Sequence, residues 1–277
     1  MAKLLSHLLE PPVHRSTSVA LAIMATAGLA LTGCGSSSSG SSAGATASAG
    51  SSALSGKITV FAAASLTGSF QALGQQFETA HPGTKVTFSF GPSSGLATQI
   101  TQGAPADVFA SASPKNMAQV ITAKAATTAT NFAKNEMEIV VPPDNPAKIT
   151  KLSDLANHKN KVVLCAAEVP CGVTARTVFS NAKLTVTPVS NEVDVKSTLA
   201  KVQLGEADAG VVYVTDVLAA GSKVKGIPIP AQDSASTEYP IAELSASKNS
   251  ALANAFVNFV LSPTGTAKIT AAGFERP

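Results

Sequence analysis

The sequence predicts an α/β fold in which mostly parallel β-sheets are flanked by helices on both faces. Short apolar runs rich in valine, isoleucine and phenylalanine alternate with helix-like segments of about ten residues. Strands that alternate with helices of this length form parallel sheets, because each helix crosses a face of the sheet between two strands. The alternation covers about 220 residues, which is enough for one large domain or two lobes.

The N-terminal half of this region begins with a continuous apolar strand. The segment that follows carries Phe70, Leu73 and Phe77 at helical spacing. Gly103 closes a second, short helix, and Ser113 is the expected N-cap of a third helix that begins with proline. The predicted strands are 58–62, 86–90 and 108–110, and the predicted helices are 67–79, 96–102 and 114–123.

The C-terminal half continues the alternation. Its first strand ends at two consecutive prolines, and Gly205 ends the helix before a buried, valine-rich strand. The predicted strands are 138–141, 162–166, 185–189, 210–214 and 241–244, and the predicted helices are 174–182, 195–204, 252–261 and 265–271.

Residues 1–33 have the features of a secretory signal peptide. Lys3 and Arg15 give a basic start, and residues 19–31 form an uncharged apolar run of about 13 residues, which is short for a membrane span. The run ends in Leu-Thr-Gly-Cys34, which resembles the lipobox of bacterial lipoproteins. This resemblance implies cleavage before Cys34 and a diacylglyceryl group on its sulfur. The alternative is an ordinary secretory signal with a chance cysteine.

Residues 34–56 are expected to form a flexible tether. After Cys34 they consist almost entirely of Gly, Ser, Ala and Thr, without charge. Such a segment cannot bury enough apolar surface to offset the entropy of ordering. Lipid, tether and folded body together predict a secreted protein that is anchored to the outer face of the cell membrane.

The composition of the body argues against several classes of partner. Of 20 basic and 17 acidic residues, Lys3, Arg15 and Glu10 precede the body, which leaves 18 and 16. With no tryptophan and no basic stripe, nucleic acid is not an expected partner. No cysteine and histidine cluster has metal-ligand spacing, so no bare metal ion is expected. In an oxidising exterior Cys165 and Cys171 are expected to pair, with two free buried thiols as the alternative.

Four junctions between a strand and the following helix share small residues and hydroxyl groups. A helix start leaves unpaired backbone N–H groups, and the helix dipole favours negative charge there. A single serine or threonine at such a place is usually only a cap. Four such junctions in one secreted, tethered chain indicate an anion site. They are 62–67, 91–95, 170–174 and 192–195.

The second junction also matches the Gly-x-Ser-x-Gly pattern of a hydrolase nucleophile, with Gly91, Ser93 and Gly95 in place. A serine hydrolase would need an acid and then a histidine later in the chain. The only histidine after Ser93 is His158, in a polar stretch, and the sequence has no HGGG-type oxyanion loop. We therefore expect Ser93 to donate a hydrogen bond to a ligand, and we do not expect an enzyme.

Four segments closely resemble the molybdate-binding lipoproteins of bacterial molybdate ABC importers, the ModA family: KITVFAAASLTGSFQALGQQFE, SFGPSSGLATQITQGAPADVFASAS, VPCGVTAR and GEADAGVVYVTDV. The resemblance runs from about Lys57 to Phe274. It implies a two-lobed periplasmic-binding-protein (type II) fold, with each lobe a mostly parallel sheet flanked by helices and with a two-strand hinge between them. Lobe I would hold 57–136 and 240–277, and lobe II 137–239.

The resemblance also implies a ligand and its donors. The family closes on a tetrahedral oxyanion, molybdate or tungstate, and delivers it to an ABC permease with its ATPase. The family commonly has alanine where this chain has Cys171. Because the contact there is a backbone N–H, the change need not abolish it, and pairing with Cys165 would stiffen the loop. Carried over by position, the donors are the hydroxyl and N–H groups of Ser65 and Ser93, the N–H groups of Cys171 and Val195, and the hydroxyl of Tyr213.

The chemistry of these five positions agrees with an oxyanion. Molybdate and tungstate are dianions near neutral pH, so their site needs donors only, and none of the five residues is charged. Arg176 and Arg276 are the body's only arginines, so an arginine clamp is not expected, and Arg176 is interpreted as a surface residue. Receptors for sulfate or phosphate are the alternatives. Asp194 would suit a protonated phosphate, although its position favours a helix cap. No cofactor is expected, and a monomer is the default for such receptors.

Overall fold

The computed structural model describes residues 54–277. Cys34, the predicted signal peptide 1–33 and most of the predicted tether lie outside the described residues. The last residue of that tether, Gly56, already begins the first strand, where it is paired with the neighbouring strand. Between residues 54 and 277, no helix is both long enough and apolar enough to cross a membrane.

The strands of the described residues form one sheet of nine strands in the order β2-β1-β3-β9-β4-β7-β5-β6, with β8 paired to β4. Neighbours within each end of the sheet are parallel, whereas β9 and β4 are antiparallel to the strands beside them. The strands are β1 (Gly56–Ala63), β2 (Thr84–Gly91), β3 (Val108–Ala110), β4 (Thr130–Val141), β5 (Val162–Cys165), β6 (Ser190–Glu192), β7 (Ala209–Tyr213), β8 (Lys225–Pro228) and β9 (Ser236–Glu243).

Helices follow most of these strands. The α-helices are α1 (Thr67–Ala80), α2 (Ser93–Thr101), α3 (Pro114–Thr122), α4 (Pro170–Asn181), α5 (Val195–Gln203), α6 (Val214–Ala220), α7 (Ser250–Leu261) and α8 (Pro263–Ala271). Short 3-10 helices are η1 (Ala64–Leu66), η2 (Leu152–Ala156) and η3 (Gly221–Lys223).

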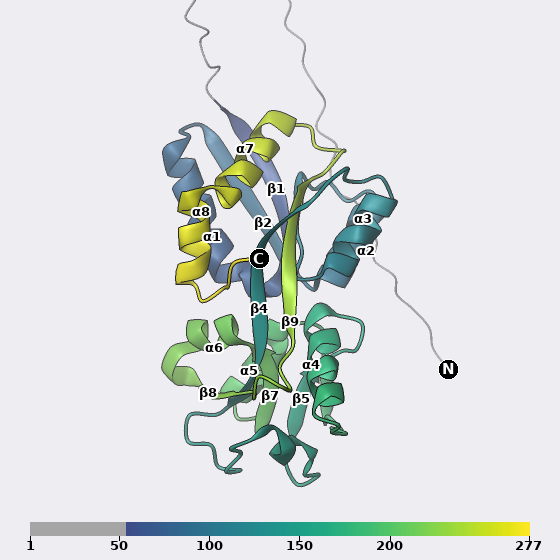
Figure 1. Cartoon of the computed structure of the whole chain (residues 1–277). Helices are drawn as coiled ribbons and strands as arrows, with labels where there is room; N and C mark the ends of the chain where they lie inside the picture. The colour runs from purple at the N-terminus through teal and green to yellow at the C-terminus, as the bar shows by residue number, and fades with distance from the viewer. Residues whose placement is uncertain (1–53) are drawn as a thin grey trace, which may run out of the picture. The chain divides into compact units, whose positions relative to one another are not determined.

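The first lobe places β1, β2 and β3 between two layers of helices (Figure 1). Helices α1, α7 and α8 cover one face, and α2 and α3 cover the other. Because side chains alternate along a strand, Ile58 and Val60 of β1 enter the first core and Phe61 enters the second. In the first core, Phe77 and Phe256 pack edge to face with their ring centroids 5.4 Å apart. Both faces of β1 are therefore buried.

The second lobe is built on β5, with β6 and β7 parallel to it on either side. One buried cluster joins the valines of β5 and β7 to Val178 of α4 and to Leu199 and Val202 of α5. Figure 1 shows α4 on one side of this sheet, and α5 and α6 on the other. The second lobe thus repeats the layered architecture of the first.

Strands β4 and β9 run through both lobes and connect them (Figure 1). β4 pairs with β9 over residues 130–136 and with β7 over residues 137–140, so its two halves belong to different parts of the sheet. β9 pairs with β3 at its C-terminal end and with β4 along most of its length. The body therefore consists of two lobes joined by two antiparallel strands.

The structure corrects several predicted elements. Residues 185–189 are not a strand; the strand of this region, β6, begins at Ser190. Pro188 within the predicted strand has no N–H group for a ladder, which disfavours that assignment. β7 ends at Tyr213, and Val214 begins α6, which was not predicted. β8 and the first eight residues of β4 were also missed, because polar residues interrupt their apolar pattern.

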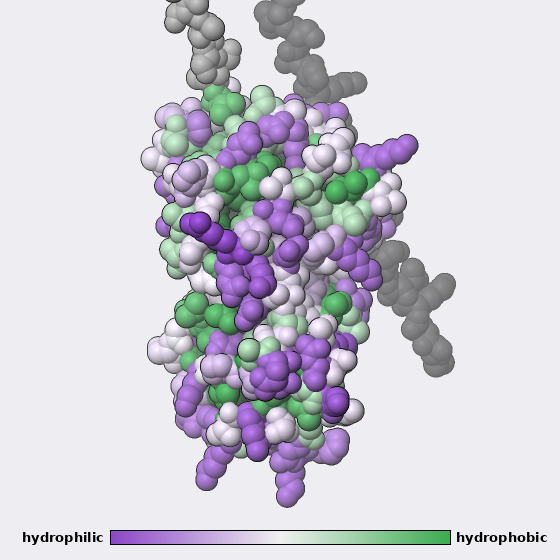
Figure 2. Space-filling model, viewed as in Figure 1, coloured by the Kyte–Doolittle hydropathy of each residue, from purple (hydrophilic) through white to green (hydrophobic). Residues whose placement is uncertain are grey.

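The face of the molecule in Figure 2 carries both polar and apolar side chains. Figure 2 shows hydrophobic residues scattered among hydrophilic ones on this face, with no continuous belt. Exposed large apolar side chains in the described residues include Val193, Leu204 and Leu218. Single apolar residues of this kind are common on folded proteins and do not by themselves indicate a binding surface.

Candidate functional site

A small cavity lies where the two lobes meet, and all five predicted site residues line it. The space open to the centre of a water molecule is about 20 Å³, compared with roughly 10–15 Å³ for a single water on this measure. The cavity therefore suits a ligand of only a few heavy atoms. Its lining consists of Ala63, Ala64, Ser65, Gly91, Pro92, Ser93, Ala112, Val169, Pro170, Cys171, Asp194, Val195 and Tyr213.

Helix starts from both lobes converge on this cavity. Ser93 begins α2 in the first lobe, whereas Cys171 in the first turn of α4 and Val195 at the start of α5 come from the second lobe. The N-cap residues of α2 and α4 provide no side-chain hydrogen bond, and neither first turn contains an acidic residue. Their N–H groups and positive dipole ends are therefore available to an anion in the cavity.

The two serines of the first lobe are both buried beside the cavity. Ser93 is 1% exposed, and its Oγ accepts a hydrogen bond of 2.9 Å from the Ala112 N–H. The Ser65 Oγ lies 2.9 Å from the Oη of Tyr239, a fully buried residue of β9. Each hydroxyl thus has one hydrogen-bond partner in the protein and keeps further hydrogen-bonding capacity for a ligand.

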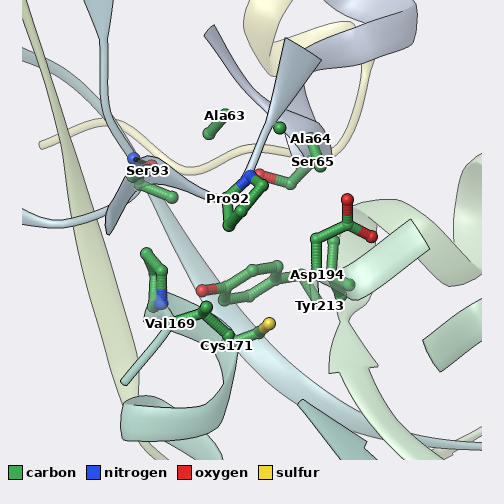
Figure 3. Close-up of a pocket in the computed structure, with 13 residues that line it drawn as sticks. Ala63, Ala64, Ser65, Pro92, Ser93, Val169, Cys171, Asp194 and Tyr213 are labelled. Atoms are coloured by element: carbon green, nitrogen blue, oxygen red, sulfur yellow. Dashed lines mark hydrogen bonds between the residues drawn. The ribbon is translucent and has the colours of Figure 1, made fainter. Parts of the chain in front are cut away.

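Tyr213 supplies a buried hydroxyl from the second lobe. No hydrogen-bond partner for its Oη exists among the described residues. Burial raises the pKa of this hydroxyl well above its usual value, and the nearby Thr174 and Tyr239 hydroxyls offset this only in part. Figure 3 shows the hydroxyl directed toward Val169 and Cys171 at the cavity. A protonated hydroxyl with no hydrogen-bond partner among the described residues therefore lies at the cavity.

The loop that carries Cys171 is fixed by three features. Cys171 is disulfide-bonded to Cys165, as predicted, with an S–S distance of 2.07 Å. A Cβ atom on Gly172 would lie 1.7 Å from the Ala166 carbonyl oxygen, so only glycine fits there. The Arg176 Nη1 donates to the carbonyls of Cys165 (3.2 Å) and Gly172 (3.0 Å). Arg176 is therefore half-buried and braces the loop, contrary to its interpretation as a surface residue, but it does not line the cavity.

Asp194 is the only carboxylate in the lining, and no Lys, Arg or His belongs to it. Its Oδ1 accepts a 2.8 Å hydrogen bond from the Ser197 N–H, so it caps α5 as expected. Figure 3 shows the carboxylate directed away from the Tyr213 hydroxyl. The cavity lining thus carries no positively charged side chain, and the charge of its one acid is engaged by a helix start.

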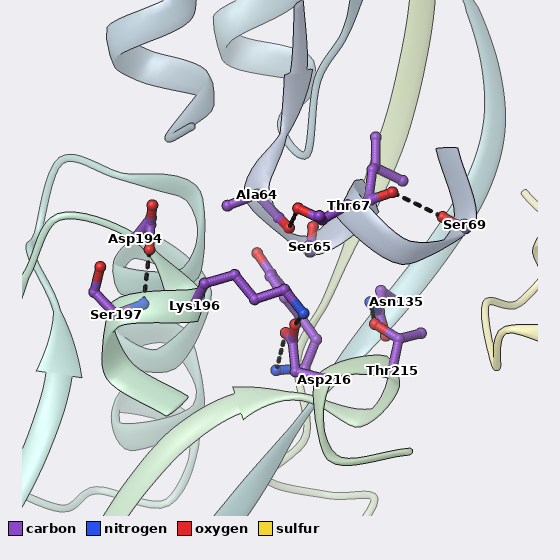
Figure 4. A network of polar contacts seen from close by, with 12 residues as sticks. Ala64, Ser65, Thr67, Ser69, Asn135, Asp194, Lys196, Ser197, Thr215 and Asp216 are labelled. Atoms are coloured by element: carbon purple, nitrogen blue, oxygen red, sulfur yellow. Dashed lines mark hydrogen bonds and ion pairs between the residues drawn. The ribbon is translucent and has the colours of Figure 1, made fainter. Parts of the chain in front are cut away.

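An ion pair with one fully buried member lies next to two of the predicted donors. Lys196 follows Val195, and its Nζ lies 2.8 Å from Oδ1 of Asp216, which is fully buried in α6 (Figure 4). The other oxygen of Asp216 accepts from the Tyr213 N–H at 3.3 Å. Burial raises the pKa of the Asp216 carboxyl, and the Lys196 charge opposes that shift. The pair links the start of α5 to the end of β7.

The Gly-x-Ser-x-Gly segment at Ser93 does not have the geometry of a hydrolase nucleophile. The backbone φ of Ser93 is not positive, and its Oγ bonds to a backbone N–H rather than to a histidine. His158 lies exposed in the polar stretch where it was expected. Within residues 54–277, no group of three or more His, Cys, Asp or Glu side chains is arranged to hold a metal ion.

Sequence reasoning missed three residues around the predicted donors. The Tyr239 hydroxyl lies 2.9 Å from that of Ser65, Asp216 accepts from the Tyr213 N–H, and Lys196 pairs with Asp216. Tyr239 had one available signal, because it is one of only two tyrosines in the chain. The ion pair of Lys196 and Asp216 had no signal in the sequence, since the two residues are 20 positions apart on different helices.

Comparison with known proteins agrees with this architecture. Residues 58–275 match a family model described as "Bacterial extracellular solute-binding protein". The chain is 44% identical over 223 residues to "Molybdate-binding protein ModA" of Mycobacterium tuberculosis, covering 79% of this chain and 85% of that protein.

Two solved structures share the fold. The Azotobacter vinelandii periplasmic molybdate-binding protein matches with a TM-score of 0.71 and 21% identity, covering 79% of this chain and 99% of that one. The sulfate-binding protein SubI of Mycobacterium tuberculosis matches with a TM-score of 0.70 and 19% identity, covering 79% and 86%. The two-lobed type II periplasmic-binding-protein fold is thereby confirmed. The chain belongs to the bacterial extracellular solute-binding proteins, in the family of the molybdate-binding ModA proteins.

Proposed function

We propose that this protein is an extracytoplasmic receptor that captures molybdate, and also tungstate, between its lobes and delivers it to an ABC permease. The observation that carries the proposal is the set of neutral donors, from both lobes, around one small cavity. Among these donors the Tyr213 hydroxyl gives the strongest indication of a ligand. A buried donor without a partner lowers folding stability unless a ligand accepts its hydrogen bond.

The proposed shell consists of seven hydrogen-bond donors: the hydroxyl and N–H groups of Ser65 and Ser93, the N–H groups of Cys171 and Val195, and the Tyr213 hydroxyl. Each bond to a charged oxygen contributes roughly 1.5–3 kcal/mol. Seven such bonds suffice for tight binding after the entropy cost of association is subtracted. The spacing of these donors, held by helix starts and a disulfide-bonded loop, would set the preferred anion size.

An anion in this position favours the closed arrangement of the lobes. Ser65 and Ser93 belong to the first lobe, and the other three donors to the second, so only the closed form offers all of them. We propose that the chain crosses between lobes at residues 136–137 and 239–240, within β4 and β9. A permease would then distinguish the loaded from the empty protein by lobe closure.

The receptor is proposed to be a monomer held at the outer membrane face by lipid on Cys34. The lipobox resemblance and the composition of residues 34–53 support the lipid anchor, and a monomer is the default for such receptors. Metabolic labelling with a fatty acid, compared between wild type and Cys34→Ala, tests the anchor. Label retained by the variant would contradict it.

Phosphate is the second candidate ligand, because Asp194 lines the cavity. A protonated phosphate would donate to this carboxylate, whereas molybdate can only be repelled by it. The orientation of Asp194 toward its own helix favours the fully deprotonated anion.

Calorimetric titration with molybdate, tungstate, sulfate and phosphate tests the proposed function. We expect binding of molybdate and tungstate at least about 100-fold tighter than of sulfate or phosphate, a difference of about 2.7 kcal/mol. Sulfate bound as tightly as molybdate would overturn the specific assignment. Stoichiometric labelling of Ser93 by a fluorophosphonate probe would instead indicate a nucleophile and would contradict a purely binding role.

A further inference from the structure

The two serine hydroxyls at the cavity have different hydrogen-bond partners within the protein. Ser93 accepts from the Ala112 N–H at 2.9 Å. An N–H group can only donate, so the single proton of the Ser93 hydroxyl is left for another acceptor. Ser65 instead lies 2.9 Å from the Tyr239 hydroxyl, which can either donate or accept. The direction of this second bond decides whether Ser65 has a proton for the anion.

We propose that Tyr239 is a positioning residue for the anion site, and that it donates to the Ser65 Oγ so that the Ser65 proton turns to the ligand. The inference rests on the proposed function, because an oxyanion is the acceptor that the Ser65 hydroxyl serves. Tyr239 does not line the cavity, and its hydroxyl lies 2.9 Å from that of Ser65, which does. Donation by Tyr239 also polarises the Ser65 hydroxyl and strengthens its bond to the anion.

The surroundings of Tyr239 keep it in place as a donor. The residue is completely buried, and its ring packs edge to face on Phe274 (5.2 Å), Tyr213 (6.2 Å) and Phe132 (6.3 Å). Burial raises the pKa of its hydroxyl well above the usual value, so the group stays protonated at neutral pH. A fixed, protonated phenol can therefore serve Ser65 without competing for the anion.

The position of Tyr239 on β9 connects the site to the strands between the lobes. Thr237, two residues earlier and so on the same face of the strand, donates to the Ala112 carbonyl at 2.8 Å. Ala112 in turn donates its N–H to Ser93. One crossing strand thus holds Ser65 directly and Ser93 through Ala112. Both hydroxyls contributed by the first lobe depend on β9 for their orientation.

A double-mutant cycle between Tyr239→Phe and Ser65→Ala tests the proposal. The chain has no tryptophan and only two tyrosines, so tyrosine fluorescence reports on this region alone, and in Tyr239→Phe only Tyr213 emits. Affinity for molybdate is measured by calorimetry and by this fluorescence for wild type, both single variants and the double variant. Thermal unfolding of each variant without anion shows whether it is folded.

We expect Tyr239→Phe to weaken molybdate binding roughly two- to tenfold in the wild-type background, since one neutral hydrogen bond is lost. In the Ser65→Ala background the same substitution should change the affinity by less than about twofold, because the hydroxyl it positions is gone. Tyr213→Phe, which removes a proposed direct donor, should weaken binding in both backgrounds.

Two outcomes would overturn the role of Tyr239 and leave the proposed function standing. In one, Tyr239→Phe weakens binding equally in both backgrounds. In the other, it does not weaken binding in the wild-type background. A wild-type protein that binds none of molybdate, tungstate, sulfate and phosphate would overturn the proposed function, and with it the role assigned to Ser65.

Discussion

Replacing Tyr213 by phenylalanine should stabilise the empty protein while weakening its hold on the anion. The substitution removes one oxygen atom, which is fully buried and has no hydrogen-bond partner among the described residues. In the empty protein this oxygen has lost its hydration, and only the nearby hydroxyls of Thr174 and Tyr239 compensate in part. With the proposed anion in place, it becomes one of seven donors. The same change therefore acts with opposite sign on stability and on affinity.

The magnitudes follow from the burial of the hydroxyl. An unsatisfied buried polar group costs about 1–3 kcal/mol of folding stability, so its removal should stabilise the protein. The small void that phenylalanine leaves offsets part of this stabilisation. A net gain of about 1 kcal/mol raises the melting temperature of a body of this size by roughly 2–4 °C. Loss of a hydrogen bond to a charged oxygen costs roughly 1.5–3 kcal/mol, which is a 10- to 150-fold weaker Kd.

Two measurements on purified protein check this prediction: thermal unfolding without anion, and calorimetric titration with molybdate. Tyr239→Phe is the matched control, because its hydroxyl has a partner in Ser65 at 2.9 Å. That control should lose stability where Tyr213→Phe gains it. A Tyr213→Phe protein that unfolds at lower temperature than wild type and binds molybdate equally well would refute the assignment of Tyr213 as an unpaired donor.

Three further predictions concern the surroundings of the site. Lys196→Met leaves the Asp216 carboxylate buried without its partner and should cost about 2 kcal/mol of folding stability, against less than about 1 kcal/mol for Lys201→Met on the same helix. These lysines are 34% and 35% exposed, so unfolding curves of the two variants compare directly. The burial-raised pKa of Asp216 means that the Lys196→Met deficit should shrink as the pH is lowered from about 7 toward 5; a deficit that grows would contradict this. Reduction of the disulfide between Cys165 and Cys171 should lower the folding stability by about 2 kcal/mol, and with it the melting temperature. It should also weaken molybdate binding. If affinity and melting temperature are both unchanged, the bond does not brace the loop. Molybdate affinity should vary less than about twofold between pH 6 and 8, because the proposed donors do not titrate there, and a steep calorimetric pH profile would reveal an ionisable ligand group.

Much of the fold could be predicted because buried strands and their following helices carry strong local signals. The apolar run at 58–62 and the spacing of Phe70, Leu73 and Phe77 identified the first strand and helix almost within their observed bounds. The connecting strands were harder. β4 runs from one lobe into the other and carries polar, half-exposed residues such as Lys134 and Glu136. Such a strand lacks the continuous apolar pattern of a buried one.

The candidate site was predictable in part for a similar reason. Four helix starts with small residues and hydroxyls can be recognised locally. The family resemblance selected one residue at each of them and added Tyr213, and the structure brings all five residues around one cavity. The groups behind them could not be recognised in this way. Tyr239 is 174 positions from Ser65, and Arg176 is 11 from the carbonyl of Cys165 that it binds. Partners of this kind are set by how β9 and the lobes pack, and no local pattern encodes that packing.

The most direct test is a crystal structure of the protein with molybdate, with anomalous diffraction measured at the molybdenum absorption edge. We predict one strong anomalous peak in the cavity between the lobes, with the hydroxyls of Ser65, Ser93 and Tyr213 and the N–H groups of Cys171 and Val195 at hydrogen-bond distance from its oxygens. A peak elsewhere on the protein, or a shell at this position that includes a lysine or arginine side chain, would contradict a site built from neutral donors.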